Sequence, residues 1–450
     1  MVISHVSKKI IFALLLGLIA FALMLTTFTL QQSFMVAFVV LMVTLWTNEG
    51  MPLAVVSLLP IILFPASGIL STKEVTANYA NPIIYLFLGG FLIAIAVEKT
   101  GLHQVMAHKM LRLFPSSARG IIFALILTSG LLSSVLSNTT TTLLLLPIAL
   151  FLTEDVKLKI RLVLGIAYGA SIGGILTPIG TPPNLILMGF MSNMHLPEIS
   201  FIQWIYMVFP LVFAMFFVVS FVLGLGLNHL TIEPLTQKKT MTTDQKKVLT
   251  VIFGVVAVLL INAPIKPYYD GLGMNEPLIL LSAGLVLFIP PFSILDWMKD
   301  KAHIPYRIMF LFGAGFAIAS AFTETGMASE IASYLTNFSH MPMLFFLLTI
   351  ATIVTFTTEI TSNTALISIM LPILYKVAEQ TSLDPALIMM VATICASYAF
   401  MLPIATPPNA IAISSGIVSV KAMAIYGLIF NLVGIGLIVL TAQLFWINLL

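Results

Sequence analysis

The sequence predicts an all-α polytopic membrane protein, with eleven transmembrane helices and two re-entrant hairpins arranged as an inverted repeat. Of its 450 residues, 60% are hydrophobic and 8% are charged, a composition that fills a bilayer. The tripeptide Ser-Asn-Thr at 137–139 recurs at 362–364, and Thr-Pro-Pro-Asn at 181–184 recurs at 406–409. Both offsets are 225 residues (362 minus 137 and 406 minus 181), so the chain is built twice around polar, helix-breaking segments.

Apolar stretches long enough to cross the bilayer predict the eleven crossings. They are expected at residues 10–30, 33–47, 51–68, 83–98, 158–180, 204–228, 248–263, 277–292, 306–323, 385–403 and 424–447. The first stretch follows Lys8 and Lys9 as a signal peptide would. It is too long for one and lacks a small-residue cleavage site, so we interpret it as the first transmembrane helix.

Two further apolar stretches, 120–152 and 342–375, are interrupted midway by the Ser-Asn-Thr motif. We interpret them as re-entrant hairpins that return to the side they left. With a cytoplasmic N-terminus and an outside C-terminus, only Lys73, Lys266 and Lys376 of the 20 lysines and arginines lie outside. This distribution follows the positive-inside rule and favours the hairpin interpretation.

The repeat keeps its register well beyond the motifs, from Gly90 and Gly315 to Pro178 and Pro403. Five crossings separate the starts of the two units, so the second unit is inverted relative to the first. The predicted division is 1–82 N-terminal scaffold helices, 83–229 first repeat unit, 230–247 cytoplasmic linker, 248–305 scaffold helices and 306–450 second repeat unit. Inverted repeats with broken helices are typical of secondary transporters, in which each half supplies part of a midplane site.

The polar segments predict a binding site for an anion and a cation. A Ser-Asn-Thr tip leaves backbone groups without helical partners in hydrocarbon, so these groups must face a cavity, an ion or a ligand. The helix that begins at the tip presents its positive end to a carboxylate. Carbonyls freed around Gly180 and Ala405 can ligate Na⁺. The alternative is that these residues only pack and kink helices, and their duplication in register argues against it.

Charged residues narrow the chemistry. No basic residue lies within the motif segments, so an anionic substrate would be held by neutral donors, helix ends and co-bound cations, which favours Na⁺ coupling. Glu359 either strengthens a cation site or carries a proton, or else it pairs with a helix end or an amide. The histidines lie at span ends or in loops, which argues against a proton relay. Basic residues are scattered, so no nucleic acid partner is expected.

Two segments outside the spans, 102–118 and 327–338, predict interfacial helices. They would serve either as arms between a moving unit and a fixed frame or as simple amphipathic connectors. The single cysteine, Cys395, excludes internal disulfides and a cysteine-based metal cluster.

The segments SNTTTTLLLLPIA, TPIGTPPN, TEITSNTA and IATPPNAI, with WTNEGMPLAVVSLLPIILFPASGIL near the start, resemble the divalent anion/sodium symporter (DASS) family, dicarboxylate carrier branch. The resemblance covers nearly the whole chain. It implies an elevator-type transporter that forms a homodimer in the plasma membrane. The implied substrates are di- and tricarboxylates such as succinate, malate, fumarate or 2-oxoglutarate, moved with Na⁺.

The resemblance also implies the site residues. The first Na⁺ site would use Ser133, Ser137, Asn138 and Gly180, and the second would use Thr358, Ser362, Asn363 and Ala405. The substrate carboxylates would meet Asn138, Thr139, Asn363 and Thr364, with Thr181, Thr406 and Pro407 lining the same pocket.

Four alternatives to Na⁺ symport of a dicarboxylate are considered. A Na⁺-independent dicarboxylate exchanger or a sulfate carrier would share the same motifs. An ion channel needs a continuous pore, against which the inverted repeat argues. An enzyme is not expected, because the spans contain no nucleophile–base pair and no acid dyad, and no organic cofactor is implied.

Overall fold

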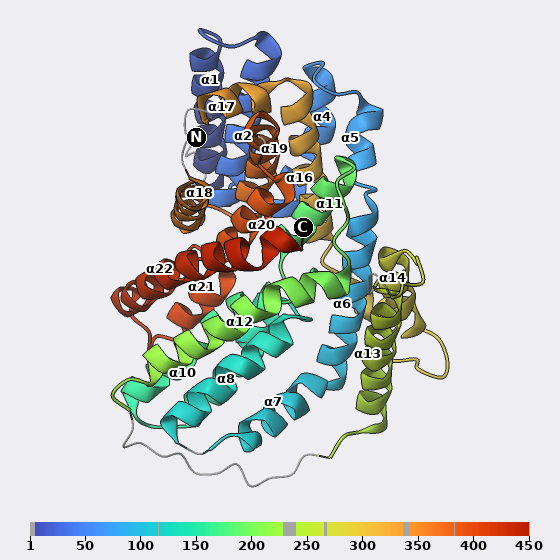
Figure 1. Ribbon diagram of the computed structural model, residues 1–450, viewed down its shortest axis with the longest axis vertical. Helices are drawn as coiled ribbons and strands as arrows, with labels where there is room; N and C mark the ends of the chain where they lie inside the picture. Colours follow the sequence, from blue (N-terminus) through green and yellow to red (C-terminus); the bar gives the residue numbers. More distant parts are fainter. Residues whose placement is uncertain are drawn as a thin grey trace.

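The structure is a computed structural model that describes residues 5–115, 117–227, 240–264, 268–335, 342–381 and 383–449. Its regular elements over these residues are helices (Figure 1). The N-terminal helices are α1 (His5–Met24), α2 (Leu30–Asn48), α3 (Leu53–Val56), α4 (Leu59–Ala66) and α5 (Thr72–Asn78). The predicted first repeat unit contains α6 (Pro82–Thr100), α7 (Leu102–Leu113), α8 (Ala118–Ser133), α9 (Asn138–Phe151), α10 (Val156–Gly174), α11 (Pro182–Asn193) and α12 (Phe201–Gly224).

The second half follows the same order. The intervening helices are α13 (Thr243–Asn262), α14 (Glu276–Val286) and α15 (Trp297–Asp300). The predicted second repeat unit contains α16 (Tyr306–Glu324), α17 (Met327–Leu335), α18 (Met343–Thr358), α19 (Asn363–Thr381), α20 (Pro385–Ala396), α21 (Pro407–Ser414) and α22 (Val420–Leu444). Helices α8 and α18 begin 225 residues apart and end 225 residues apart (343 minus 118 and 358 minus 133), which extends the duplication from motif to helix.

Six helical stretches over the described residues are long and apolar enough to cross a membrane. They are Val6–Met24, Leu30–Asn48, Thr72–Thr100, Phe201–Gly224, Tyr306–Glu324 and Val420–Asn448, and several shorter apolar helices accompany them. Every predicted crossing overlaps a helix, although the bounds differ.

Five predicted crossings have wrong bounds. The stretches 10–30 and 277–292 end as helices at Met24 and Val286. The other three differ for a local reason. The stretch 51–68 is two short helices, α3 and α4, because Pro60 lacks an N–H and its ring clashes with the carbonyl four residues earlier. The stretches 158–180 and 385–403 end as helices at Gly174 and Ala396. Pro178 and Pro403 follow these ends, and the chain stays irregular up to the Thr-Pro-Pro-Asn motifs.

Both predicted hairpin segments contain two helices that separate at the Ser-Asn-Thr motif, α8 with α9 and α18 with α19. Ser137 caps α9, because its Oγ accepts from Thr140 N at 3.1 Å. Helix α7 lies in the first predicted interfacial segment, and α17 covers the described part of the second. The predicted linker 230–247 lies partly outside the described residues, and its end is helical because the capping box of Thr242 and Gln245 starts α13 there.

The two units exchange short helices. Helix α11 packs against α19 and α20, whereas α21 packs against α9 and α10. Figure 1 shows α8, α10 and α12 side by side, with α21 and α22 next to them. Because α11 and α21 begin at the Thr-Pro-Pro-Asn motifs, this exchange brings the motifs of both units into one region.

Two glutamines hold the C-terminal ends of α6 and α16 in the same way. Gln245 Nε2 donates to Thr100 O at 2.8 Å, and Gln32 Nε2 donates to Thr325 O at 3.1 Å. Both glutamines are buried and close the capping boxes that start α13 and α2. The contact of α2 with the end of α16 is therefore equivalent to the contact of α13 with the end of α6.

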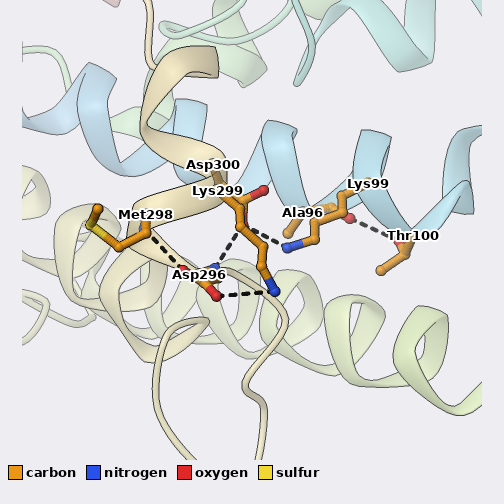
Figure 2. Close-up of polar contacts among 7 residues, drawn as sticks. All are labelled: Ala96, Lys99, Thr100, Asp296, Met298, Lys299 and Asp300. Carbon is orange, nitrogen blue, oxygen red and sulfur yellow. Dashed lines mark hydrogen bonds and ion pairs between the residues drawn. The ribbon is translucent and has the colours of Figure 1, made fainter.

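An ion pair fixes the end of α6 to the segment that precedes α16 (Figure 2). Lys99 Nζ lies 2.6 Å from Asp300 Oδ2, which also accepts from Asp296 N at 2.7 Å. Burial raises the pKa of Asp300, but the Asp296 N–H and the Lys99 ammonium lower it by more, so the net pKa lies below the usual value.

Candidate functional site

The motifs of both units line one cavity of about 790 Å³. Eleven of the sequence-predicted site residues contribute to its wall: Ser137, Asn138, Thr139, Gly180, Thr181, Ser362, Asn363, Thr364, Ala405, Thr406 and Pro407. The other two, Ser133 and Thr358, are buried behind this wall. Residues far apart in the chain therefore meet at a single site, as the duplication of the motifs predicts.

The two buried hydroxyls hold the two motif asparagines. Ser133 Oγ donates to Asn138 Oδ1 at 2.6 Å, and Thr358 Oγ1 contacts Asn363 Oδ1 at 2.7 Å. Thr358 Oγ1 also lies 2.8 Å from the carbonyl oxygen of Ala396, at the end of α20. Each asparagine is thus oriented from behind while its residue faces the cavity.

Four helix N-termini border the cavity. Helices α9 and α19 begin at Asn138 and Asn363, and α11 and α21 begin one residue after Thr181 and Thr406. The first backbone N–H groups of a helix have no intrahelical acceptor, and the macrodipole adds partial positive charge there. The cavity therefore offers an anion positive helix ends from both repeat units.

The backbone and the Asn138 side chain pack closely around the first motif, and this packing depends on two glycines. A Cβ on Gly174 would lie 2.5 Å from Asn138 Oδ1, and a Cβ on Gly180 would lie 2.3 Å from Gly174 O. Gly174 thus lies close to the side chain of Asn138 and also close to the backbone of Gly180. Hydroxyl, amide and carbonyl oxygens of this kind suit a hard cation such as Na⁺.

The last residue of each Thr-Pro-Pro-Asn motif fixes the irregular segment before it. Asn184 Nδ2 donates to Thr177 O at 2.9 Å, and Asn409 Nδ2 donates to Leu402 O at 3.0 Å. Asn409 Nδ2 also donates to Ala399 O at 3.0 Å. Both asparagines are fully buried. They were part of the recognised motif, but the sequence assigned them no separate role.

Glu359 has a structural role in this geometry. Its carboxylate accepts from Met401 N and Leu402 N, each at 2.9 Å, and from Asn431 Nδ2 at 2.7 Å. The residue is 3% exposed and is absent from the cavity wall. Of the two roles that the sequence left open, the contacts match the pairing with backbone and amide groups.

Two charged side chains, Glu49 and Arg307, also belong to the described wall of the cavity. Glu49 ends α2, and Arg307 lies in the first turn of α16. Sequence reasoning missed both, because neither lies near a motif in the chain. The 225-residue offset gave no signal either, since it pairs Arg307 with Pro82.

The described residues contain no group of three or more His, Cys, Asp or Glu that could hold a metal ion. The side-chain oxygens of the two Ser-Asn-Thr motifs, which are potential ligands of a cation, are neutral. Tight binding of a transition metal would need softer or more charged ligands.

Comparison with known proteins gives a consistent family. The model of the citrate transporter family matches residues 39–394. A sodium-dependent dicarboxylate transporter of Staphylococcus saprophyticus is 33% identical, over 90% of this chain and 85% of its own length. A Staphylococcus aureus protein of the same name is 32% identical, over 95% of this chain and 89% of its own length.

Two solved structures share the fold at low sequence identity. The YdaH transporter of Alcanivorax borkumensis has a TM-score of 0.60 and 15% identity, over 83% of this chain and 87% of its own. The MtrF protein of Neisseria gonorrhoeae, described as one of a class of antimetabolite efflux pumps, has a TM-score of 0.59 and 14% identity, over 82% and 83%. These two similarities concern the arrangement of the helices alone.

Proposed function

Because the chain belongs to the citrate transporter family and to the dicarboxylate branch of the divalent anion/sodium symporters, we propose that it couples uptake of a dicarboxylate to Na⁺. It is a multi-pass transporter of the plasma membrane and not an enzyme. The proposed substrates are C4 and C5 dicarboxylates such as succinate, malate, fumarate and 2-oxoglutarate. The relatives' names, which include sodium dependence and dicarboxylates, support the coupling ion and the substrate class.

One observation carries the proposal: both Ser-Asn-Thr motifs and four helix N-termini surround one cavity. A dicarboxylate has two anionic ends, and the pseudosymmetric halves offer each end one asparagine, one threonine and a positive helix end. We assign the carboxylates to Asn138, Thr139, Asn363 and Thr364, with Thr181, Thr406 and Pro407 beside them. The distance between the two sets of carboxylate-binding residues then determines which anions fit the pocket, sulfate included.

The two Na⁺ ions would flank this pocket. Ser133, Ser137, Asn138 and Gly180 form the first proposed site, and Thr358, Ser362, Asn363 and Ala405 form the second. The shared asparagines would link cation and anion binding, because an amide fixed by the cation also presents its other atom to the substrate. Na⁺ would in addition offset the charge of a dianion in a site without basic motif residues.

The proposed orientation in the membrane indicates which side of the cavity is open. Val6 near the start of α1, Glu49 at the end of α2 and Arg307 at the start of α16 all border it. With a cytoplasmic N-terminus, all three lie at cytoplasmic helix ends, so we infer an inward-facing state. In an elevator the two re-entrant hairpins would carry the site outward, with α7 and α17 as arms to a dimeric scaffold.

Transport by purified protein in liposomes tests the proposal. We expect labelled succinate to accumulate under an inward Na⁺ gradient and not when choline replaces Na⁺. Unlabelled malate, fumarate and 2-oxoglutarate should compete, and sulfate should compete weakly. Uptake that ignores Na⁺ but requires a preloaded dicarboxylate would select the exchanger, and strong competition by sulfate alone would select the sulfate carrier.

A further inference from the structure

We propose that Arg307 captures the anion at the mouth of the cavity, where Glu49 opposes it with the reverse charge. This inference rests on the proposed transport function. It adds a charged entry position to a binding site whose inner wall is formed by neutral polar groups, helix ends and apolar side chains.

Arg307 is available for a ligand. Its side chain is exposed, and it forms no hydrogen bond or ion pair with the described residues. Glu49, on the same wall, is likewise unpaired over the described part of the chain. The two residues therefore form no ion pair with each other within the described residues.

The position of Arg307 is unfavourable for its own helix. It is the second residue of α16, where the partial positive charge of the helix end disfavours a cation. Helix stability does not explain an arginine here. A basic residue that anchors the chain at the cytoplasmic interface is the structural alternative, and it would not need to lie on the cavity wall.

The expected effect is electrostatic and scales with the charge of the solute. An unpaired guanidinium beside a cleft raises the local concentration of anions and speeds their entry, while a carboxylate acts in the opposite direction. The effect is screened by salt, since the Debye length falls from about 10 Å at 0.1 M to about 3 Å at 1 M ionic strength. Arg307 should therefore set the apparent affinity on the side where the cavity opens.

The test compares the two faces of the membrane. Inside-out vesicles expose the cytoplasmic face and intact cells expose the outer face, and KM for succinate is measured on both at fixed Na⁺. Choline chloride is used to vary ionic strength. The variants are Arg307→Gln, Arg307→Lys and Glu49→Gln. The matched control is Lys301→Gln, which removes the same charge six residues earlier in the chain and away from the cavity wall.

We expect Arg307→Gln to raise the KM on the cytoplasmic face about three- to tenfold at low ionic strength, with little change on the outer face. The ratio of the KM of Arg307→Gln to that of the wild type should approach one in high salt. It should be larger for a trivalent than for a divalent anion. Arg307→Lys should keep most of the affinity, and Glu49→Gln should lower the KM. Lys301→Gln should behave as the wild type.

Three results would overturn the inference: an unchanged KM for Arg307→Gln at low salt, an equal change on both faces, or an equal loss in Arg307→Lys. If Arg307→Gln fails to insert, Arg307→Lys and Glu49→Gln still give predictions of defined sign. Wild-type protein that moves no dicarboxylate would instead refute the proposed function, so the two failures are distinguishable.

Discussion

Ser133 Oγ donates a hydrogen bond of 2.6 Å to Asn138 Oδ1, across the break between α8 and α9. The same relationship joins Thr358 to Asn363 at 2.7 Å in the second unit. A hydroxyl at the end of one helix thus sets the amide that begins the next. The asparagine side chains are held in place before any ligand arrives, and preorganisation of this kind lowers the cost of binding.

Replacing either motif asparagine should strongly reduce uptake. Asn138→Ala and Asn363→Ala each remove an amide from the cavity wall, and a hydrogen bond to a charged group contributes about 1.5–3 kcal/mol. We expect uptake to fall at least about tenfold. Ser133→Ala should mainly raise the Na⁺ concentration needed for half-maximal uptake. Thr352→Ala, on an exposed position of α18, is the control. Normal uptake by Asn138→Ala or Asn363→Ala would refute our site.

Methyl groups at the first motif should disturb transport. Gly180→Ala places a Cβ 2.3 Å from Gly174 O, and Gly174→Ala places one 2.5 Å from Asn138 Oδ1. The surrounding backbone must shift, so we expect Na⁺-driven uptake to drop strongly in both variants. In Gly254→Ala the new methyl has no neighbour within 4 Å, and uptake should be unchanged. Uptake assays on equal amounts of folded protein compare the three; wild-type activity in Gly180→Ala would contradict the expected contact.

Glu359 should contribute to stability and not to proton coupling. Glu359→Ala leaves two half-buried N–H groups and the buried amide of Asn431 without their acceptor, at a cost of up to about 1–3 kcal/mol for each group that stays unpaired. Thermal unfolding in detergent should show a clear loss of stability, smaller for Glu359→Gln, which keeps one acceptor oxygen. If Glu359 carried a proton, Glu359→Gln would instead abolish a pH dependence of transport while unfolding as the wild type does.

The two glutamine contacts should be energetically similar. Gln245→Leu and Gln32→Leu each remove a capping box and leave a carbonyl at the end of α6 or α16 without its donor. We expect each to lower the free energy of unfolding by about 1–2 kcal/mol. Gln104→Leu, at an exposed position of α7, is the control. A large effect in one variant and none in the other would contradict the symmetry of these contacts.

The Lys99–Asp300 pair should make stability depend on pH at acidic values. The pKa of Asp300 is lower in the folded than in the unfolded state, so the unfolded state binds more protons as pH falls. The stabilisation of the folded state by the ionised Asp300 carboxylate is fully present above the unfolded pKa of about 3.9. It is lost as pH falls through the folded pKa. Asp300→Asn should lower stability at neutral pH and reduce the loss below pH about 4. Denaturant unfolding of the wild type and of Asp300→Asn from pH 7 to pH 3 measures this pH dependence of stability. Parallel curves of unfolding free energy against pH for the two proteins would contradict the prediction.

Local chemistry explains how much of the site was predictable. Proline removes a donor and clashes with the preceding turn wherever it stands, so the interruptions at the Thr-Pro-Pro-Asn motifs could be expected. The predicted helix bounds were wrong where a proline outside these motifs follows or interrupts a helix, as at Pro60, Pro178 and Pro403. Eleven of the predicted site residues line the cavity because their motif geometry is local and duplicated.

The sequence did not allow us to predict the hydrogen-bond partners of Gln32, Gln245 and Glu359. Gln32 reaches Thr325, which lies 293 residues away in the chain. Glu359 accepts hydrogen bonds from residues that lie 42, 43 and 72 positions later in the chain. A side chain's partner depends on how helices pack, and no periodicity in the chain encodes that pairing.

The sequence by itself determined the membrane class, the duplication and the polar breaks, because hydropathy and helix disruption act within a few residues. Only the tertiary structure decided that α11 and α21 pack against the opposite unit, that Arg307 and Glu49 reach the cavity, and that Glu359 supports a backbone segment instead of the cavity wall. These relationships arise when helices bury their apolar faces against one another and carry distant residues together as they pack.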